Sequence, residues 1–126
     1  MREIKFRGKD KDGNWIYGYF IKSQTGKCFI QSILGFIIEV DCKTVGQFTG
    51  LYDKNGTEIY EGDIVKATLK YFDIENRICK IIFKDGCFGV QYGFDETYFK
   101  PIDIWDDIEV ISNVYDESFK SGRKKL

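Results

Sequence analysis

The side chains of this sequence that could take part in chemistry are carboxylates and thiols, because the chain has 20 acidic residues, four cysteines and no histidine. Without histidine, neither a Ser–His nor a Cys–His dyad can form. The carboxylates nearest to a recognisable pair are Glu61 and Asp63. Residues two apart share a face only when both lie within one strand, and no third ligand accompanies this pair. We therefore interpret the segment as a corner in which Asp63 accepts backbone N–H bonds and Gly62 adopts an unusual φ.

The four cysteines are Cys28, Cys42, Cys79 and Cys87, and their spacing contains no Cys-x-x-Cys pair of the kind that binds zinc. The chain shows no recognisable secretion signal, and a domain of this length does not need disulfides to be stable. Free cysteine packs as a small apolar residue in strand-like segments. We therefore expect four reduced cysteines, no bound metal and no cofactor.

The acidic turn at residues 10–14 begins like a calcium-binding EF-hand loop, but its spacing does not continue as one. Its glycine falls at the fourth position, where an EF-hand requires the sixth, and the twelfth position is Ile21 in place of glutamate. Phosphate-binding glycine motifs are also missing. The sequence thus predicts no catalytic residue, and we expect a protein that is not an enzyme. A small enzyme that works without histidine is the third alternative.

Alternation of apolar and polar residues is the dominant pattern, and it predicts strands. In residues 63–72, the expected buried face is Val65, Ala67, Leu69 and Tyr71, and the expected solvent face is Lys66, Thr68 and Lys70. Residues 77–84 repeat the pattern. There the expected buried residues are Cys79, Ile81 and Phe83. The opposite face holds Ile78, Lys80, Ile82 and Lys84; we expect it to be partly covered, with its two lysines mostly exposed.

Further strands are expected where β-branched and aromatic residues gather between turn signals. These segments are Ile4–Arg7, Trp15–Lys22, Cys28–Ile33, Phe36–Val40, Val45–Phe48, Cys87–Tyr92 and Ile108–Val114. One helical turn is expected within residues 95–107, where Pro101 limits its length. Many short strands at short spacing predict an all-β fold, either a barrel or a sandwich.

Three glycine turns are expected to connect strands, at Asp10–Gly13, Asp53–Gly56 and Lys84–Gly86. Asn-Gly and Asp-Gly between strand-like runs are strong signals for tight hairpins. We predict a type I′ turn at Asn55-Gly56, with Gly56 at positive φ. The first two turns resemble each other in sequence, and independent selection of good turn residues explains this more simply than duplication.

The charges nearly cancel, with 19 basic against 20 acidic residues. A chain that coats phosphate backbones is usually strongly basic, so broad nucleic-acid binding is not favoured. No apolar stretch is long enough to span a membrane and no signal peptide is recognisable, so we expect a cytoplasmic protein. The basic end of the chain, residues 118–126, is expected to be a solvated, disordered tail.

Three segments together carry a family resemblance: Met1–Gly8 with the hairpin that follows it, Thr44–Val65, and Ile108–Glu117. On these segments the chain resembles the YopX family of phage and prophage proteins over nearly its full length. The resemblance implies a fold similar to SH3-type β-barrels and a place in the bacterial host cytosol, and it implies no particular activity. Ser112 and the tail Ser118–Leu126 depart from the usual C-terminal pattern of that family.

We therefore expect a single domain over residues 1–126, with a small SH3-like β-barrel centred on residues 44–115 and additional N-terminal β-hairpins packed against it. Its expected role is that of a phage-encoded accessory protein that binds a protein partner or forms a homo-oligomer. The candidate anchors are aromatic, namely Trp15, Tyr17, Tyr19, Tyr92 and Tyr98. Aromatic residues are enriched at interface hot spots, and they are equally ordinary in cores.

Nucleic-acid binding is the alternative function. Lysines interleave with aromatic residues at Lys66–Phe72 and Lys80–Lys84, an arrangement that could form a stacking platform edged by charge. A strand pair with one buried face and one solvated lysine face accounts for the same pattern by alternation alone. Protein binding is therefore the favoured function.

Overall fold

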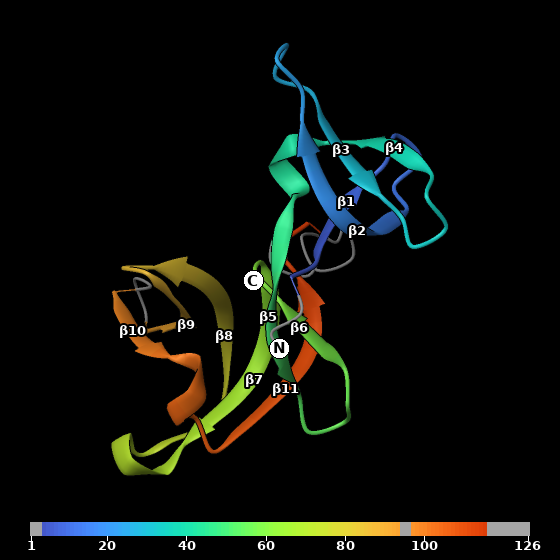
Figure 1. Cartoon of the computed structure of the whole chain (residues 1–126). Coiled ribbons are helices and arrows are strands. Elements are labelled where there is room, and N and C mark those ends of the chain that lie inside the picture. The colour runs from blue at the N-terminus through green and yellow to red at the C-terminus, as the bar shows by residue number, and fades with distance from the viewer. Residues whose placement is uncertain (1–3, 94–96, 116–126) are drawn as a thin grey trace. The chain divides into compact units, whose positions relative to one another are not determined.

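The computed structural model describes residues 4–93 and 97–115 (Figure 1). The predicted all-β class is confirmed, because these residues form strands, turns and three short 3-10 helices, with no α-helix among them. The strands are β1 (Phe6–Lys9), β2 (Trp15–Lys22), β3 (Cys28–Gln31), β4 (Ile37–Val40), β5 (Gly46–Tyr52), β6 (Glu58–Tyr60), β7 (Asp63–Leu69), β8 (Ile74–Lys84), β9 (Cys87–Tyr92), β10 (Tyr98–Pro101) and β11 (Asp107–Asn113). The 3-10 helices are η1 (Cys42–Thr44), η2 (Lys70–Phe72) and η3 (Ile102–Ile104). No helix in this part of the chain is long and apolar enough to cross a membrane.

The chain divides into two compact units, residues 1–50 and residues 51–126. Strand β5 passes from the first unit into the second, and in the order of hydrogen-bonded strands it stands between β1 and β6. The expectation of one domain over the whole chain stays a prediction. The expected basic tail, residues 118–126, lies outside the described residues.

The first unit is an antiparallel sheet in the order β4-β3-β2-β1-β5. Ile30 of β3 lies opposite Phe20 of β2 on one side and opposite Ile38 of β4 on the other. The core of this unit consists of the buried residues Cys28, Ile30 and Val40, with Phe6, Ile16, Phe20 and Val45 packed against them. The end of β4 is tied back to β1, because the Asp41 N–H donates to the Lys9 carbonyl over 2.8 Å.

A disulfide joins Cys28 to Cys42, so the expectation that all four cysteines are reduced is wrong for this pair. Cys28 lies opposite Val40 at the end of the β3–β4 hairpin. The chain then enters η1, which places the two Cα atoms 5.3 Å apart. The expectation rested on compartment and domain size, whereas this proximity arises from strand pairing. Cys79 and Cys87 are free thiols.

The second unit contains a five-stranded antiparallel sheet in the order β10-β9-β8-β7-β11. Strands β7 to β10 follow one another as a meander, and β11 returns to pair with β7. The main core packs on this sheet. Its buried members are Ile59, Val65, Ala67, Leu69, Ile74, Cys79, Ile81, Phe88, Val90, Tyr92, Ile102 and Trp105.

The expected barrel is not closed in the described part of the chain. Strands β10 and β11 stand at opposite ends of the second sheet, where each has one neighbour. β10 ends at Pro101, which has no N–H to donate, and η3 follows it directly. The helical turn expected within residues 95–107 is therefore only the 3-10 helix η3, and the strand Tyr98–Pro101 before it was not predicted.

The predicted register of β7 and β8 is confirmed at the centre of the sheet. Buried as expected are Val65, Ala67, Leu69, Cys79 and Ile81, and exposed as expected are Lys66, Lys70 and Lys84. Tyr71 was placed wrongly, because β7 ends at Leu69 and η2 leaves the Tyr71 side chain 87% exposed. Phe83 was also placed wrongly. It is 50% exposed because it lies near the end of the β8–β9 hairpin, where its ring packs edge-on against Phe88.

Two polar residues are less exposed than predicted. Thr68 is buried, because the register between β7 and β8 shifts between Ala67 and Leu69. Its hydroxyl oxygen accepts a hydrogen bond from the Asn76 N–H over 3.0 Å. Lys80 is half-buried, since β8 has a strand on each side at that position.

The predicted positive φ of Gly56 is confirmed at +82°, and Gly13 and Gly86 adopt similar values. The type I′ assignment at Asn55-Gly56 is wrong, because Asn55 does not have positive φ. Positive φ at two successive turn residues, as a type I′ turn requires, occurs instead at Asp85-Gly86, between the paired strands β8 and β9.

The turn after β5 is a five-residue connection that its first residue organises. The Asp53 N–H donates to the Thr57 carbonyl, and the Gly56 N–H donates to the Asp53 carbonyl. The Asp53 carboxylate oxygen Oδ1 also accepts the N–H groups of Asn55 and Thr57, at 2.8 and 2.9 Å. This side-chain bonding favours the longer turn over the two-residue type I′ turn.

Candidate functional site

One face of the first sheet is apolar although it lies outside the core. Side chains alternate along a strand, so Tyr17, Tyr19 and Ile21 of β2 lie on the side opposite Phe20. Strand pairing extends this face through β3 and β4. We call Tyr17, Tyr19, Ile21, Phe29, Gln31 and Ile37 the apolar face. On the same side of the sheet, Arg7 of β1 lies opposite Tyr17 and Glu39 of β4 lies opposite Phe29. A sheet with one solvated side normally presents polar residues there, so apolar residues on both sides indicate that both become covered.

The tip of the β3–β4 hairpin carries more exposed apolar side chains. Ile33 is 97% exposed, Leu34 80% and Phe36 65%. The turn that holds them is ordered, because the Ser32 N–H donates to the Phe36 carbonyl and the Gly35 N–H donates to the Ser32 carbonyl. Turns of this kind usually carry small and polar residues, so large apolar side chains here are typical of a contact surface.

A groove of about 490 Å³ lies on the apolar face. Its lining residues are Ile4, Lys5, Tyr17, Gly18, Tyr19, Gln31 and Ile33. Gly18 is required by close strand packing, since a Cβ at this position would lie 1.9 Å from the Gln31 carbonyl oxygen. The structure therefore brings two predicted anchors, Tyr17 and Tyr19, into one exposed apolar site.

The third anchor predicted on β2, Trp15, lies in a different environment. Its ring is half-buried, with the Arg7 guanidinium 4.4 Å and the Lys9 ammonium 5.3 Å from the ring centre. Cation–π contacts of this kind stabilise the side chains that form them. Trp15 thus joins β1 to β2 and is less available as an anchor than Tyr19.

Tyr92 and Tyr98 are brought together in the second unit. Their rings stack with centres 5.4 Å apart, and Tyr92 also meets Trp105 edge-on at 5.5 Å. Tyr92 is buried, and burial together with the neighbouring Tyr98 raises the pKa of its hydroxyl. Tyr98 is 59% exposed. Tyr92 is therefore a core residue, and only Tyr98 presents a surface.

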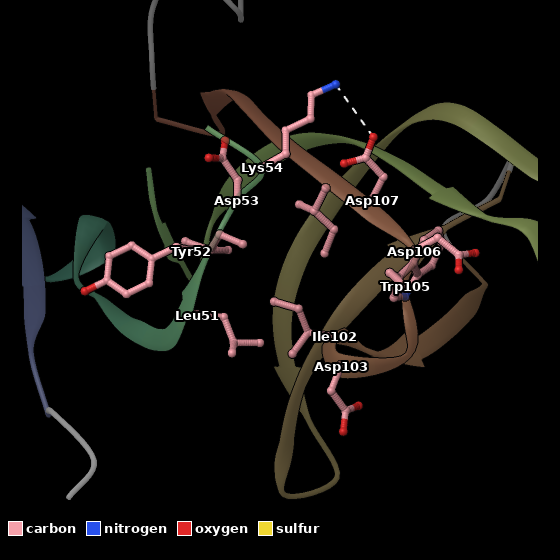
Figure 2. A pocket seen from close by; sticks show the side chains of 11 residues that line it. Leu51, Tyr52, Asp53, Lys54, Ile102, Asp103, Trp105, Asp106 and Asp107 are labelled. Atoms are coloured by element: carbon pink, nitrogen blue, oxygen red, sulfur yellow. Dashed lines mark ion pairs between the residues drawn. The ribbon is translucent and has the colours of Figure 1, made fainter. Parts of the chain in front are cut away.

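A pocket of about 360 Å³ in the second unit is the other concave candidate (Figure 2). The buried side chains of Ile59, Ile102 and Trp105 contribute its apolar lining. Four aspartates and one lysine contribute its polar lining, namely Asp53, Asp103, Asp106, Asp107 and Lys54. The hydrogen bonds and ion pairs of these side chains decide whether they are available for chemistry.

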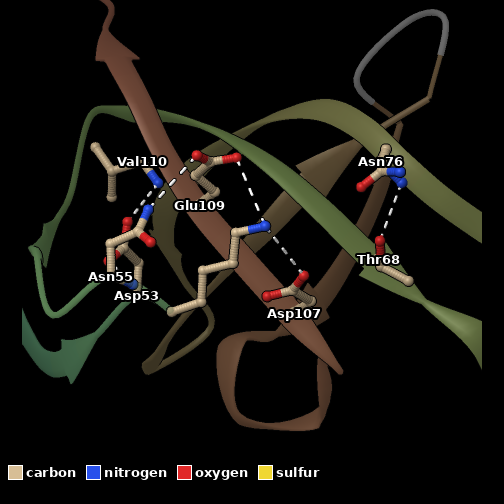
Figure 3. Close-up of polar contacts among 8 residues, drawn as sticks. Asp53, Asn55, Thr68, Asn76, Asp107, Glu109 and Val110 are labelled. Carbon is tan, nitrogen blue, oxygen red and sulfur yellow. Dashed lines mark hydrogen bonds and ion pairs between the residues drawn. The ribbon is translucent and has the colours of Figure 1, made fainter.

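Both carboxylate oxygens of Asp53 accept hydrogen bonds from backbone N–H groups (Figure 3). Its Oδ2 accepts the Val110 N–H at 2.8 Å, in addition to the two N–H groups that Oδ1 accepts within the turn. Burial alone would raise the pKa of this carboxyl, but the backbone N–H donors outweigh it and hold the pKa below the usual 3.8. Asp53 is therefore an ionised structural residue that ties the turn to β11.

Two of the other three pocket carboxylates, Asp106 and Asp107, are also paired. Asp106 accepts the Lys70 N–H at 2.7 Å. The Lys54 ammonium lies 3.6 Å from Asp107 and 3.8 Å from Glu109. A dashed line in Figure 2 marks the ion pair between Lys54 and Asp107. These exposed ion pairs are weak, and none of the arrangements couples a proton donor to a nucleophile.

Of Glu61 and Asp63, the carboxylate pair singled out in the sequence, Asp63 has a structural role. Asp63 is buried and accepts the Tyr60 N–H at 2.8 Å, and Gly62 has φ +94°, so the corner interpretation is confirmed. Within residues 4–93 and 97–115, no group of three or more cysteine or acidic side chains could hold a metal ion. The roles of Asp53, Asp63 and Asp106 are thus explained by the fold.

An exposed aromatic turn lies at η2. Tyr71 and Phe72 pack edge-on with ring centres 5.0 Å apart, and the Lys100 ammonium lies 4.5 Å from the centre of the Phe72 ring. Both rings are exposed, Tyr71 at 87% and Phe72 at 46%. Lys70 adjoins them and is exposed. Within the lysine and aromatic segment Lys66–Phe72, the exposed rings are therefore those of η2.

Sequence reasoning missed the apolar residues of the β3–β4 hairpin, although a signal for them was present. The segment Ile33–Ile38 contains five large apolar residues around Gly35. Such a run around a turn glycine leaves no polar face on either side of the hairpin.

A family model described as YopX protein matches residues 5–119. No curated protein matches the chain.

Proposed function

The chain belongs to the YopX family, and from that premise we propose that it acts without catalysis, as a module that binds another protein. The observation that carries this proposal is the apolar face with its adjoining hairpin tip. The exposed side chains of Tyr19, Ile33 and Ile37 are 66%, 97% and 59% accessible. Contiguous apolar surface of this kind is costly in water unless a partner covers it.

The experiment compares capture of proteins by the wild type and two variants, from a bacterial lysate that also contains an untagged copy of this chain. Tyr19→Glu places a charge on the apolar face, and Tyr71→Glu places one at an exposed tyrosine in the other unit. We expect a nuclease-resistant protein to be retained by the wild type and Tyr71→Glu, and lost by Tyr19→Glu. Equal retention by all three, or retention that nuclease abolishes, would count against the proposal.

Nucleic-acid binding is the second candidate, and the exposed aromatic turn at η2 favours it. Stacked bases need accessible rings beside positive charge, which Tyr71, Phe72 and Lys100 supply. The test is a titration of fluorescent single-stranded DNA, with Tyr71→Ala as the variant and Tyr19→Ala as the control. Affinity that falls with salt and with Tyr71→Ala alone would support this candidate.

We also propose that the second unit is related to SH3-type barrels and that the protein is a phage accessory factor working in the host cytosol. The support for the fold is the strand order of this unit. Strands β7 to β10 form a meander, and the following strand β11 returns to pair with β7. The support for the origin and location is family membership. An experimental structure with β11 paired elsewhere would contradict the fold relationship.

A further inference from the structure

We propose that the partner of the apolar face is a second copy of this chain, bound by packing of the two faces across a two-fold axis. This inference rests on the proposed protein-binding function and specifies its partner. The exposed apolar area is large enough for a stable interface. Taking about 150–250 Å² for a whole large side chain, the exposed parts of the face, Ile33 and Ile4 amount to roughly 550–900 Å². That is about what each partner contributes to a stable interface, and it is at or above the largest patch of a typical monomer.

The charge distribution of the apolar face allows it to pack against an identical face. A two-fold interface brings the same surface of both copies together, so like charges at its centre would repel. The row of paired residues across the centre of this face, Tyr19, Gln31 and Ile37, carries no charge. The charged residues Arg7 and Glu39 lie in the strands that flank it, β1 and β4. A neutral apolar centre is therefore compatible with a partner of identical sequence.

Opposite charges lie at the two borders of the face. Lys5 lies next to Phe6 on the β1 side, and Glu39 lies in β4 at the other end of the sheet. When two such sheets pack face to face across a two-fold axis that runs parallel to the strands, the β1 side of one copy meets the β4 side of the other. Lys5 of one protomer then approaches Glu39 of its partner, which favours this arrangement.

The shape of the surface also suits this mode of association. Antiparallel sheets pack face to face when their inner faces present alternating apolar side chains. Tyr17, Tyr19 and Ile21 alternate in this way along β2, with the hairpin tip beside them. The groove of about 490 Å³ provides space for a large side chain of the second copy, such as the 97% exposed Ile33.

The test is sedimentation equilibrium of the full chain across the micromolar to millimolar range, with circular dichroism to verify the fold of each variant. The variants are Tyr19→Glu and Ile33→Ser on the face, with Tyr71→Glu as the matched control. We expect a concentration-dependent dimer for the wild type and for Tyr71→Glu. Tyr19→Glu should weaken the dimer at least about 30-fold, as expected for an interface hot spot. Because the Ile33 side chain is almost wholly exposed, Ile33→Ser tests the interface without a folding defect.

The outcomes separate this inference from the proposed function. A dimer that Tyr19→Glu and Ile33→Ser leave unchanged would place the interface elsewhere and overturn the inference. A wild type that stays monomeric throughout the range would also overturn it. In that case, protein capture that Tyr19→Glu abolishes would leave the protein-binding function standing with a different partner. Capture unaffected by Tyr19→Glu would overturn both.

Discussion

Asp53 and Asp10 occupy equivalent positions in two turns, and they show how burial changes the importance of the same side chain. Each carboxylate Oδ1 accepts two N–H groups from its own turn. Asp53 alone is buried and has an additional donor in Val110 of β11. The two residues therefore form a matched pair for measuring what the tertiary contact adds.

We expect Asp53→Ala to destabilise the fold by about 2–3 kcal/mol, because it leaves buried N–H donors without an acceptor. Asp10→Ala should cost under about 1 kcal/mol, since water replaces its exposed carboxylate. Urea unfolding at neutral pH measures both. Equal costs for the two substitutions would show that the bond to Val110 contributes little.

The contribution of Asp53 should depend on pH in a defined direction. Its folded-state pKa lies below the usual 3.8, so its stabilising effect is complete above the pKa of the unfolded chain. The effect is lost as the pH falls through the folded pKa. The stability difference between wild type and Asp53→Ala should thus be constant above about pH 5 and shrink below about pH 4. A difference that grew on acidification would contradict this assignment.

The cysteines should react as two distinct classes. In the unfolded, unreduced protein a thiol reagent should detect two thiols, and four after reduction, because Cys28 and Cys42 form a disulfide. In the folded protein only Cys87 should react quickly. Burial raises the pKa of Cys79 to about 11, so almost none of its thiolate is present at neutral pH. Four thiols before reduction would rule out the disulfide.

At the scale of the elements, one turn design recurs along the chain. The turns that begin at Asp10, Ser23, Ser32 and Asp53 share a backbone pattern in which the N–H of the fourth residue donates to the first carbonyl. In each, the first N–H also donates to the fifth carbonyl, and the fourth residue is glycine at positive φ. The sequence echo between the first and last of these turns follows from shared turn chemistry.

The strand β7 provides the clearest test of register. We expect Leu69→Ala to destabilise by about 2–5 kcal/mol, because Leu69 is 3% exposed and its truncation leaves a core cavity. Tyr71→Ala, two residues further on, should cost little because η2 carries that side chain into solvent. Denaturation midpoints measure both changes. An unchanged midpoint for Leu69→Ala would remove Leu69 from the core.

Local patterns predicted some elements accurately and left others out. The strands Trp15–Lys22 and Cys87–Tyr92 have the predicted bounds. Strand β8 begins earlier than predicted, at Ile74. The segment before it contains Asp73 at positive φ, a conformation that no local signal indicated. The short strand β10 was missed because its pairing with β9 stabilises a sequence with weak alternation.

At the scale of the whole molecule, the two tryptophans report on different units. Trp15 lies in the first unit and Trp105 in the second. The variants Trp105→Phe and Trp15→Phe therefore isolate the fluorescence of one unit each. We expect a reducing agent to lower the transition reported by Trp15, because the disulfide closes a loop in that unit whose constraint is worth about 3 kcal/mol.

The transition that Trp105 reports should not move on reduction, since Cys79 and Cys87 of the second unit are already free. The control is the Cys28→Ser/Cys42→Ser double variant, in which the reducing agent should change neither transition. A single transition that shifts as a whole would show that the two units unfold together.

The sequence alone was sufficient for the all-β class and the positive φ of the turn glycines, because each depends on residues close together in the chain. It was also sufficient for the family, because each of the three motifs that carry the resemblance is continuous in sequence. Alternation selects strands, and positive φ selects glycine, whatever the rest of the molecule does. The same reasoning placed Val65, Leu69 and Ile81 in the core.

Only the tertiary structure decided which apolar residues remain outside that core. Phe83 is exposed where its hairpin extends beyond the sheet, and Ile37 is exposed because the core lies on the other side of β4. The Cys28–Cys42 disulfide likewise follows from the pairing of β3 with β4. Burial and proximity depend on which strands are neighbours, and strand order is set by contacts between residues that are distant in sequence.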